Sequence, residues 1–383
     1  MSSPHAELPA GMWFYSFMFG GKKPLVGQFV AEGRVPEPST LLLGIGIGVV
    51  LTAARLVLDF IVFKPLARAV LGIPGDRVAK AKPSPALDDL CSKSKSKMLT
   101  AEEVDKAVVL TGLSPEEIQD YARVKREVFL ENKQVNKFKE AAWRLMTYAG
   151  LVGLALKLSY GEPWFNDPFL VWRNWPAGDH GEGLEAYYHI AMGVYWHLIM
   201  FQLWDTRRSD FWQMFVHHVA TLFLLTYSWL VSLVRIGVLV MLVHDVSDIF
   251  MESAKLFNYA QKRFPWCHLL ADGIFFAFAA VFGYSRLCIY PQYMVYNTWQ
   301  AEELDVISRR FFCSLLSLLL ALHVFWMYLI LRMVYMFIFH GVEEDIRSDN
   351  GDKPVHVDGV APAYAAANGN TNGGRTGGKS KEA

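Results

Sequence analysis

The sequence has little charge and no excess of either sign. Of its 383 residues, 19% are charged, and the 37 Lys and Arg residues equal the 37 Asp and Glu residues. A protein that binds DNA or RNA usually carries a strongly basic face, and this charge balance gives no global electrostatic case for one. We therefore expect no nucleic-acid partner.

Cysteine is scarce as well. The four cysteines, Cys91, Cys267, Cys288 and Cys313, are scattered and show neither zinc-ligand spacing nor the pattern of a disulfide framework.

The sequence also has no Asn-x-Ser/Thr acceptor site for glycosylation. Its first 37 residues lack a basic start followed by an apolar run, so we expect the first transmembrane helix to direct targeting.

Apolar residues, in contrast, are abundant. The chain is 53% hydrophobic and 14% aromatic, which exceeds the usual content of a soluble domain. About seven stretches reach the roughly 20 residues that a helix needs to cross a bilayer. They cover residues 40–63, 141–160, 186–204, 211–232, 235–257, 266–290 and 311–339. Lipid offers no partner for free backbone groups, so the sequence predicts an all-α, polytopic membrane helical bundle.

Basic residues in short loops indicate the orientation of these spans. Arg207 and Arg208 lie between the third and fourth spans, and Lys262 and Arg263 lie between the fifth and sixth. Both loops fall on the same side of the predicted bundle, which we assign to the cytosol. The C-terminus then also faces the cytosol.

This orientation divides the chain into five parts. They are a luminal N-terminus (1–39), a first transmembrane helix (40–63), a cytosolic segment (64–140), a helical bundle (141–340) and a cytosolic tail (341–383). The tail is acidic at first and then rich in Gly, Ala and Asn, which predicts disorder. Lys379 and Lys381 have the spacing of a dilysine retrieval address, so we expect a multi-pass protein of the endoplasmic reticulum membrane.

The predicted cytosolic segment contains two helix-start signals. Thr100 with Glu103, and Ser114 with Glu117, have the spacing of capping boxes, and Gly112 is a helix stop. The sequence predicts two helices joined by a tight turn, near residues 101–111 and 115–131. The second helix is basic and could read DNA, but a structural or membrane-surface element is the more probable interpretation on these residues.

Two consecutive predicted spans contain ionisable residues, which are costly in lipid and usually face an interior cavity. The fourth span carries His217 and His218, and the fifth carries Asp245, Asp248 and Glu252 on one helix face. When the two helices are placed antiparallel about the short turn that joins them, His218 lies at the same height along the bundle as Asp248. We expect Asp248 to hold a ring N–H of the histidine pair, at a depth of roughly 9–10 Å from the cytosolic edge.

Three functions fit such a cluster. The histidines could perform acid–base or nucleophilic chemistry, bind a metal ion together with the carboxylates, or simply hold helices together by hydrogen bonds. Adjacent histidines on a helix point about 100° apart, which disfavours a metal centre. The size of the cluster favours function over packing. We interpret three other histidines as packing residues: His189, His197 and His323.

The block from Trp204 to Tyr259 contains WDTRRSDFWQMFVHHVATLFLLTYSW and RIGVLVMLVHDVSDIFMESAKLFNY. This block resembles the Lag1p motif of the ceramide synthases, which belong to the TRAM–LAG1–CLN8 (TLC) superfamily of membrane proteins. FKPLARAVLGI, KFKEAAWR and LHVFWMYLILRMVYMFIFHGVEEDIRSD resemble other parts of these proteins, so the resemblance covers roughly residues 55–349. Residues 99–135 resemble a degenerate form of the homeobox-like region of animal ceramide synthases.

The resemblance implies an activity. Ceramide synthases N-acylate a sphingoid base such as sphinganine with a fatty acyl-CoA, giving dihydroceramide or ceramide and free CoA. It implies that residues 141–340 form the TLC catalytic bundle, with acyl-CoA as co-substrate and no permanently bound cofactor or metal. The residues on which the family relies correspond here to His217, His218, Asp245 and Asp248.

The phosphates of CoA would need basic residues at a cytosolic mouth, for which Arg207, Arg208, Lys262 and Arg263 are candidates by position. Two other functions stay open. One is a non-enzymatic TLC-domain protein that senses or transports lipid, and the other is a proton-coupled transporter that uses the same cluster as a relay. A homodimer or heterodimer also stays open.

Overall fold

The computed structural model describes residues 36, 38–73, 85–94, 99–175, 180–205, 208–304 and 306–340. Within these ranges every regular element is a helix, which confirms the predicted all-α class. The predictions for residues 1–35, for Arg207 and for the tail 341–383 with its dilysine address concern parts of the chain outside the described residues.

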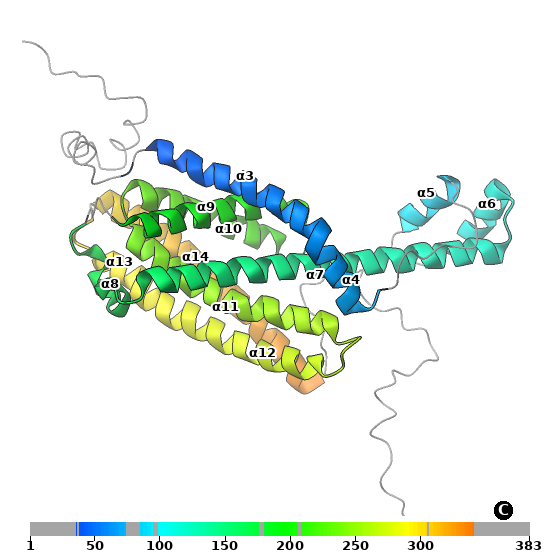
Figure 1. The fold of residues 1–383 in the computed structure, drawn as a ribbon. Helices are drawn as coiled ribbons and strands as arrows, with labels where there is room; N and C mark the ends of the chain where they lie inside the picture. Colours follow the sequence, from blue (N-terminus) through cyan, green and yellow to red (C-terminus); the bar gives the residue numbers. More distant parts are fainter. Residues whose placement is uncertain are drawn as a thin grey trace, which may run out of the picture.

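Long helices packed side by side make up most of the described chain (Figure 1). They are α3 (Leu41–Leu58) with η2 (Asp59–Phe63) and α4 (Lys64–Leu71), α7 (Pro115–Ser159), α9 (Glu182–Gln202), α10 (Phe211–Leu230), α11 (Val234–Ala260), α12 (Cys267–Gly283) with η4 (Tyr284–Ile289), η5 (Pro291–Tyr296) and α13 (Asn297–Gln300), and α14 (Val306–His340). The shorter elements are η1 (Pro38–Thr40), α5 (Pro85–Ser94), α6 (Ala101–Thr111), α8 (Pro163–Asn166) and η3 (Pro168–Trp172).

Three of the described helices are long and apolar enough to cross a membrane by length and composition. They are Leu41–Leu71, Cys267–Gln300 and Ser308–Phe339. The count of about seven spans stays a prediction, because α7, α9, α10 and α11 do not meet this criterion. Polar side chains such as His217, His218 and Asp245 lower the hydropathy of these inner helices.

Two predicted helix boundaries are wrong. We predicted one helix at 115–131 and a separate span at 141–160, but α7 is a single helix of 45 residues. Residues 132–140 contain neither Gly nor Pro, so nothing in the backbone interrupts it. The sixth span does not end at residue 290 either. It continues to Gln300 through η4 and η5, two π-helical segments whose wider turns accommodate Pro291.

Both predicted capping boxes are present. The side chain of Thr100 accepts a hydrogen bond from the backbone N–H of Glu103, and Ser114 does the same for Glu117. Gly112 ends α6 in the left-handed conformation at φ 69°. The helix starts and the stop that we read from the sequence are therefore confirmed.

The sequence did not predict α5, which packs against α6 and the start of α7. Leu87 of α5 is fully buried with Ile118 and Tyr121 of α7. The Tyr121 hydroxyl donates to Asp88 at 2.8 Å, and Lys125 lies 2.9 Å from the same carboxylate. The hydrogen bond from Lys125 lowers the pKa of Asp88. α5, α6 and the start of α7 therefore form a small helical unit with its own hydrophobic cluster, and its homeobox-like character stays a prediction.

Glycines let α3 and α9 approach each other closely. A Cβ built at Gly48 would lie 2.8 Å from the Cβ of Trp196 and 3.1 Å from the carbonyl oxygen of Gly193. A Cβ built at Gly193 would lie 2.5 Å from Cγ2 of Ile47. Both contacts are too short for a side chain, so the two backbones pack directly, as at many interfaces between membrane helices.

The bundle has two chemically different ends. At the basic end, Asp205 bonds Arg55 at 2.7 Å and Arg144 at 2.8 Å, and Arg263 donates to the carbonyl of Ala69. At the opposite, aromatic end, formed by residues 161–175, 231–233 and 301–304, the indole of Trp172 donates to Asn297 at 2.8 Å and that of Trp175 donates to the carbonyl of Val231 at 2.9 Å. The two loops that we assigned to one side of the membrane therefore lie at one end.

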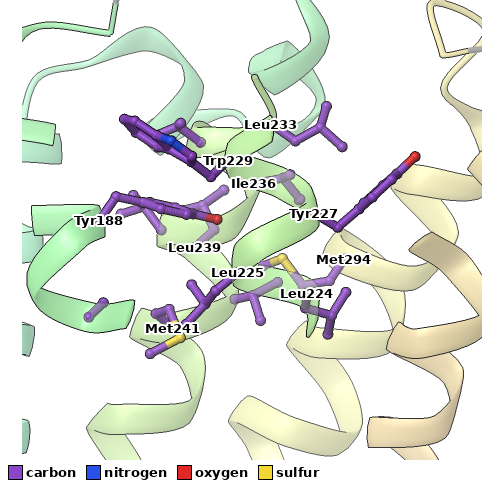
Figure 2. Packing of buried hydrophobic residues seen from close by; sticks show 14 of the residues in the cluster. Tyr188, Leu224, Leu225, Tyr227, Trp229, Leu233, Ile236, Leu239, Met241 and Met294 are labelled. Carbon is purple, nitrogen blue, oxygen red and sulfur yellow. The ribbon is translucent and has the colours of Figure 1, made fainter. Parts of the chain in front are cut away.

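The main core fills the half of the bundle nearer the aromatic end. It is centred on the turn between α10 and α11, where Tyr188 and Trp229 stack with ring centroids 5.7 Å apart (Figure 2). Leu224 and Met241 belong to the same cluster (Figure 2). The cluster contains the C-terminal half of α10 and the N-terminal half of α11, so the other halves of these helices remain available to build a site.

The contact between α3 and α9 gives a stability prediction. We expect Gly48→Ala to lower the free energy of unfolding by about 1–3 kcal/mol, because the new methyl group would overlap the Cβ of Trp196 and crowd the carbonyl oxygen of Gly193. Gly46→Ala is the matched control, since a Cβ at Gly46 meets nothing within 4 Å and alanine favours the helix. Thermal unfolding in detergent measures both variants. Equal Tm values for the two would contradict the packing described for α3 and α9.

Candidate active site

A pocket lies between the helices in the half of the bundle nearer the basic end. Its empty volume is about 1230 Å³, including its open part. Side chains from α7, α9, α10, α11, α12, η4 and α14 line it, together with the segment that joins α9 to α10. Figure 1 shows α9, α10, α11 and α14 running side by side in this region.

Five polar side chains line the inner part of this pocket: His217 and His218 of α10, Asp248 and Glu252 of α11, and Arg286 of η4. The turn between α10 and α11 is short, and it brings these halves of the two helices together. The predicted meeting of the histidine pair with the carboxylate face of the next helix therefore occurs for His217, His218 and Asp248.

His217 is 7% exposed and is surrounded by aromatic rings. Its ring centroid lies 5.6 Å from that of His218, 6.0 Å from that of His244 and 5.3 Å from that of Trp326, whose ring stands at 86° to it. The Trp326 indole N–H donates to Asp210 at 3.3 Å. Nδ1 of His217 has no hydrogen-bond partner within the described chain. Packing, rather than a hydrogen bond, sets the orientation of this ring.

His218 is held differently. Its Nδ1 lies 2.9 Å from Oε1 of Gln202, and the edge of its ring faces Tyr195 at a centroid distance of 6.1 Å. Gln202 in turn donates to the carbonyl of Phe211 at 2.9 Å. The adjacent histidines therefore have distinct supports, although both line the same pocket.

Asp248 is paired with an arginine and not with a histidine. Arg286 donates to Oδ1 of Asp248 at 2.6 Å and to the backbone carbonyl of His244 at 2.9 Å. The hydrogen bond that we expected from a ring N–H of the histidine pair to Asp248 is not among those of the described residues. A guanidinium makes a stronger, charge-assisted bond to a carboxylate than a neutral imidazole does, and η4 delivers one to this position.

Asp245 and two further histidines lie behind the pocket. Asp245 is 1% exposed and does not line the pocket, and neither carboxylate oxygen has a hydrogen-bond partner in the described ranges. His244 donates from Nδ1 to the carbonyl of Val240 at 2.6 Å, and its Nε2 lies 2.8 Å from Nε2 of His323. His323, which we interpreted as an isolated packing residue, is therefore hydrogen-bonded to a neighbour of His217. Among the described residues, no group of three or more His, Cys, Asp and Glu side chains is arranged to hold a metal ion.

Of the basic residues that we predicted at the entrance of the site, only some line the pocket. Arg208 lines the pocket, whereas Lys262 and Arg263 do not line it and are exposed in the turn after α11. Arg207 lies outside the described residues. Arg144, which we counted only as a weakness of the second predicted span, lines the pocket beside its partner Asp205.

Sequence reasoning missed three side chains that position the site: Gln202, Arg286 and Trp326. Arg286 could have been found, because an arginine inside an apolar span is itself a signal of function. Gln202 and Trp326 are uncharged, so neither stands out in an apolar span as Arg286 does. Each also lies on a different helix from the histidine that it contacts, which the sequence does not reveal.

Comparison with known proteins gives related sequences over most of the chain. The sequence profile of the TLC domain matches residues 137–332. Ceramide synthase 4 of Homo sapiens is 34% identical over 330 residues, which cover 83% of this chain and 80% of that protein. Ceramide synthase 3 of Homo sapiens is 32% identical over 319 residues, covering 82% and 81%. Ceramide synthase LOH2 of Arabidopsis thaliana is 35% identical over 254 residues, covering 63% and 81%.

The pair formed by Arg286 and Asp248 gives a prediction for stability. Arg286→Met leaves the part-buried carboxylate of Asp248 without its counter-charge, so we expect the free energy of unfolding to fall by up to about 3–5 kcal/mol, the range for a fully buried pair. The double variant Arg286→Met/Asp248→Asn removes both charges and should unfold at a higher temperature than the single variant. A double variant that is no more stable than Arg286→Met would contradict this account of the pair.

Proposed function

The chain belongs to the ceramide synthase family, and we propose that it transfers the acyl group of a fatty acyl-CoA to the amino group of a sphingoid base such as sphinganine. The products are dihydroceramide or ceramide and free CoA. The observation that most supports this activity is the pocket, which presents His217 and His218 inside a helical bundle and has charged residues at one end.

The reaction needs a group that accepts a proton. The amine of a sphingoid base is mostly protonated at neutral pH, and it attacks the thioester carbonyl only after losing a proton. A neutral imidazole can accept that proton and release it to solvent, and it can accept a second proton from the nitrogen as the amide forms. The C–N bond then forms, the C–S bond breaks, and the sulfur of CoA leaves with a proton. Alternatively, one histidine attacks first to form an acyl-imidazole, which the amine then displaces.

The pocket contains surfaces suited to both substrates. Arg144 and Arg208 could bind the phosphates of CoA, and Arg207 precedes Arg208 in the sequence. The fatty acyl and sphingoid chains need an apolar surface, which lies between α12 and α14. Its residues are Phe278, Phe282, Leu329, Ile330 and Met333.

We place the protein in the endoplasmic reticulum membrane, with about seven spans. The basic end of the bundle and the C-terminus face the cytosol in this proposal, because short loops rich in Arg and Lys stay on that side. Acyl-CoA is water-soluble, and a pocket whose charged residues face the cytosol can receive it there.

A non-enzymatic TLC-domain protein that senses or transports lipid is the alternative. A lipid carrier needs an apolar cavity but no proton acceptor. Such a carrier gains nothing from two buried histidines on the pocket wall, since burying a polar group costs free energy. This chain has both histidines, which favours the enzyme.

Product formation tests the proposal. Protein purified in detergent is incubated with sphinganine and a panel of acyl-CoAs, and mass spectrometry measures dihydroceramide. We expect product from the wild type and at least about a 100-fold loss for His217→Ala and His218→Ala. His268→Ala, outside the pocket at the basic end, is the matched control and should keep wild-type activity. A folded wild type that makes no product with any acyl-CoA would favour the lipid-binding alternative.

The covalent route makes a separate prediction. If a histidine is acylated first, the intact mass of the protein should rise by one acyl group when acyl-CoA is added without sphinganine, and adding sphinganine should reverse the change. The double variant His217→Ala/His218→Ala should show no increase. An unchanged wild-type mass, with normal turnover when both substrates are present, would favour direct attack by the amine.

A further inference from the structure

Gln202 links the end of α9 to the start of α10. It is the last residue of α9, and its side chain makes two hydrogen bonds across the junction. The amide nitrogen Nε2 donates to the backbone carbonyl of Phe211 at 2.9 Å. The amide oxygen Oε1 lies 2.9 Å from Nδ1 of His218. Gln202 and His218 both line the pocket.

These two contacts determine which nitrogen of His218 carries the proton. A backbone carbonyl can only accept, so the NH₂ group of Gln202 must face Phe211 and its oxygen must face His218. That oxygen cannot donate, so the hydrogen in the second bond belongs to Nδ1 of His218. A neutral imidazole carries one N–H, and Nε2 is therefore left with its lone pair.

The choice of an amide has a further consequence. In a Ser-His-Asp triad a carboxylate orients the histidine and also stabilises the imidazolium. Gln202 orients His218 in the same way but carries no charge. No carboxylate is hydrogen-bonded to His218 within the described chain, and the nearby Asp248 is paired with Arg286. His218 is thus oriented while it stays neutral, as a proton acceptor must be before the reaction.

We propose that Gln202 is a positioning residue that holds the proton of His218 on Nδ1, so that Nε2 accepts a proton from the attacking amine. This inference rests on the proposed acyl transfer. On the direct route, the ammonium group first releases one proton to solvent, and Nε2 takes a second proton from the nitrogen as the C–N bond forms. The same proton passes to the thiolate sulfur of CoA as the C–S bond breaks, which returns His218 to its starting state.

Two variants separate this role from a structural one. Gln202→Glu keeps an oxygen that accepts from His218 but loses the donor to the Phe211 carbonyl. Gln202→Met is of similar size and loses both hydrogen bonds. We expect Gln202→Met to lower kcat about 100-fold with KM for both substrates little changed. Gln202→Glu should come within a few-fold of the wild type only at a pH high enough to keep His218 neutral, because its carboxylate favours the imidazolium, so its pH–rate profile should shift to higher pH. Gln261→Met, at the exposed end of α11, is the matched control and should keep wild-type kcat.

The outcomes are distinct. Wild-type kcat in Gln202→Met would overturn the proposal, and so would an equal loss in both variants at every pH, because the link to Phe211 would then be what matters. Tm is measured for every variant, and Gln202→Leu replaces Gln202→Met if the latter does not fold. Failure of the wild type to make product would instead overturn the proposed function, and this result cannot be confused with the others.

Discussion

The ion pair between Asp248 and Arg286 determines the shape of the inner pocket. An isolated charge is very costly inside a helical bundle, so Arg286 can be buried only because the part-buried carboxylate of Asp248 is beside it. Arg286 also donates to the backbone of His244, which ties η4 to α11, and the bond between His244 and His323 continues this connection to α14. Three helices are thereby joined at the pocket, and His217 of α10 packs against His244 with ring centroids 6.0 Å apart.

The half of the bundle that lies away from the pocket is filled by a hydrophobic core, which supports this arrangement. The cluster around Tyr188 and Trp229 fills the half nearer the aromatic end, and the glycine contact holds α3 against α9. α10 and α11 are thus anchored through their core halves, while their other halves carry the polar residues. A packed core next to a pocket is well suited to an enzyme that must hold two long-chain substrates near histidines in fixed positions.

Much of this could be predicted from the sequence, but only where the information is local. Helix class, the two capping boxes and the placement of His217, His218 and Asp248 on one pocket follow from composition, short motifs and a short hairpin turn. The unbroken α7 was missed because we weighed the change from polar to apolar residues more than the lack of a helix breaker. The partners of Asp248 and His218 were missed because they lie on other helices, and helical spacing says nothing about contacts between distant segments.

The most direct test is a structure of the protein with a non-hydrolysable acyl-CoA analogue, in which a thioether replaces the thioester. The account predicts that the sulfur lies beside His217 and His218, that the phosphates contact Arg144 and Arg208, and that the acyl chain runs between α12 and α14. An analogue bound with its sulfur away from both histidines, or bound outside this pocket, would contradict the central claim.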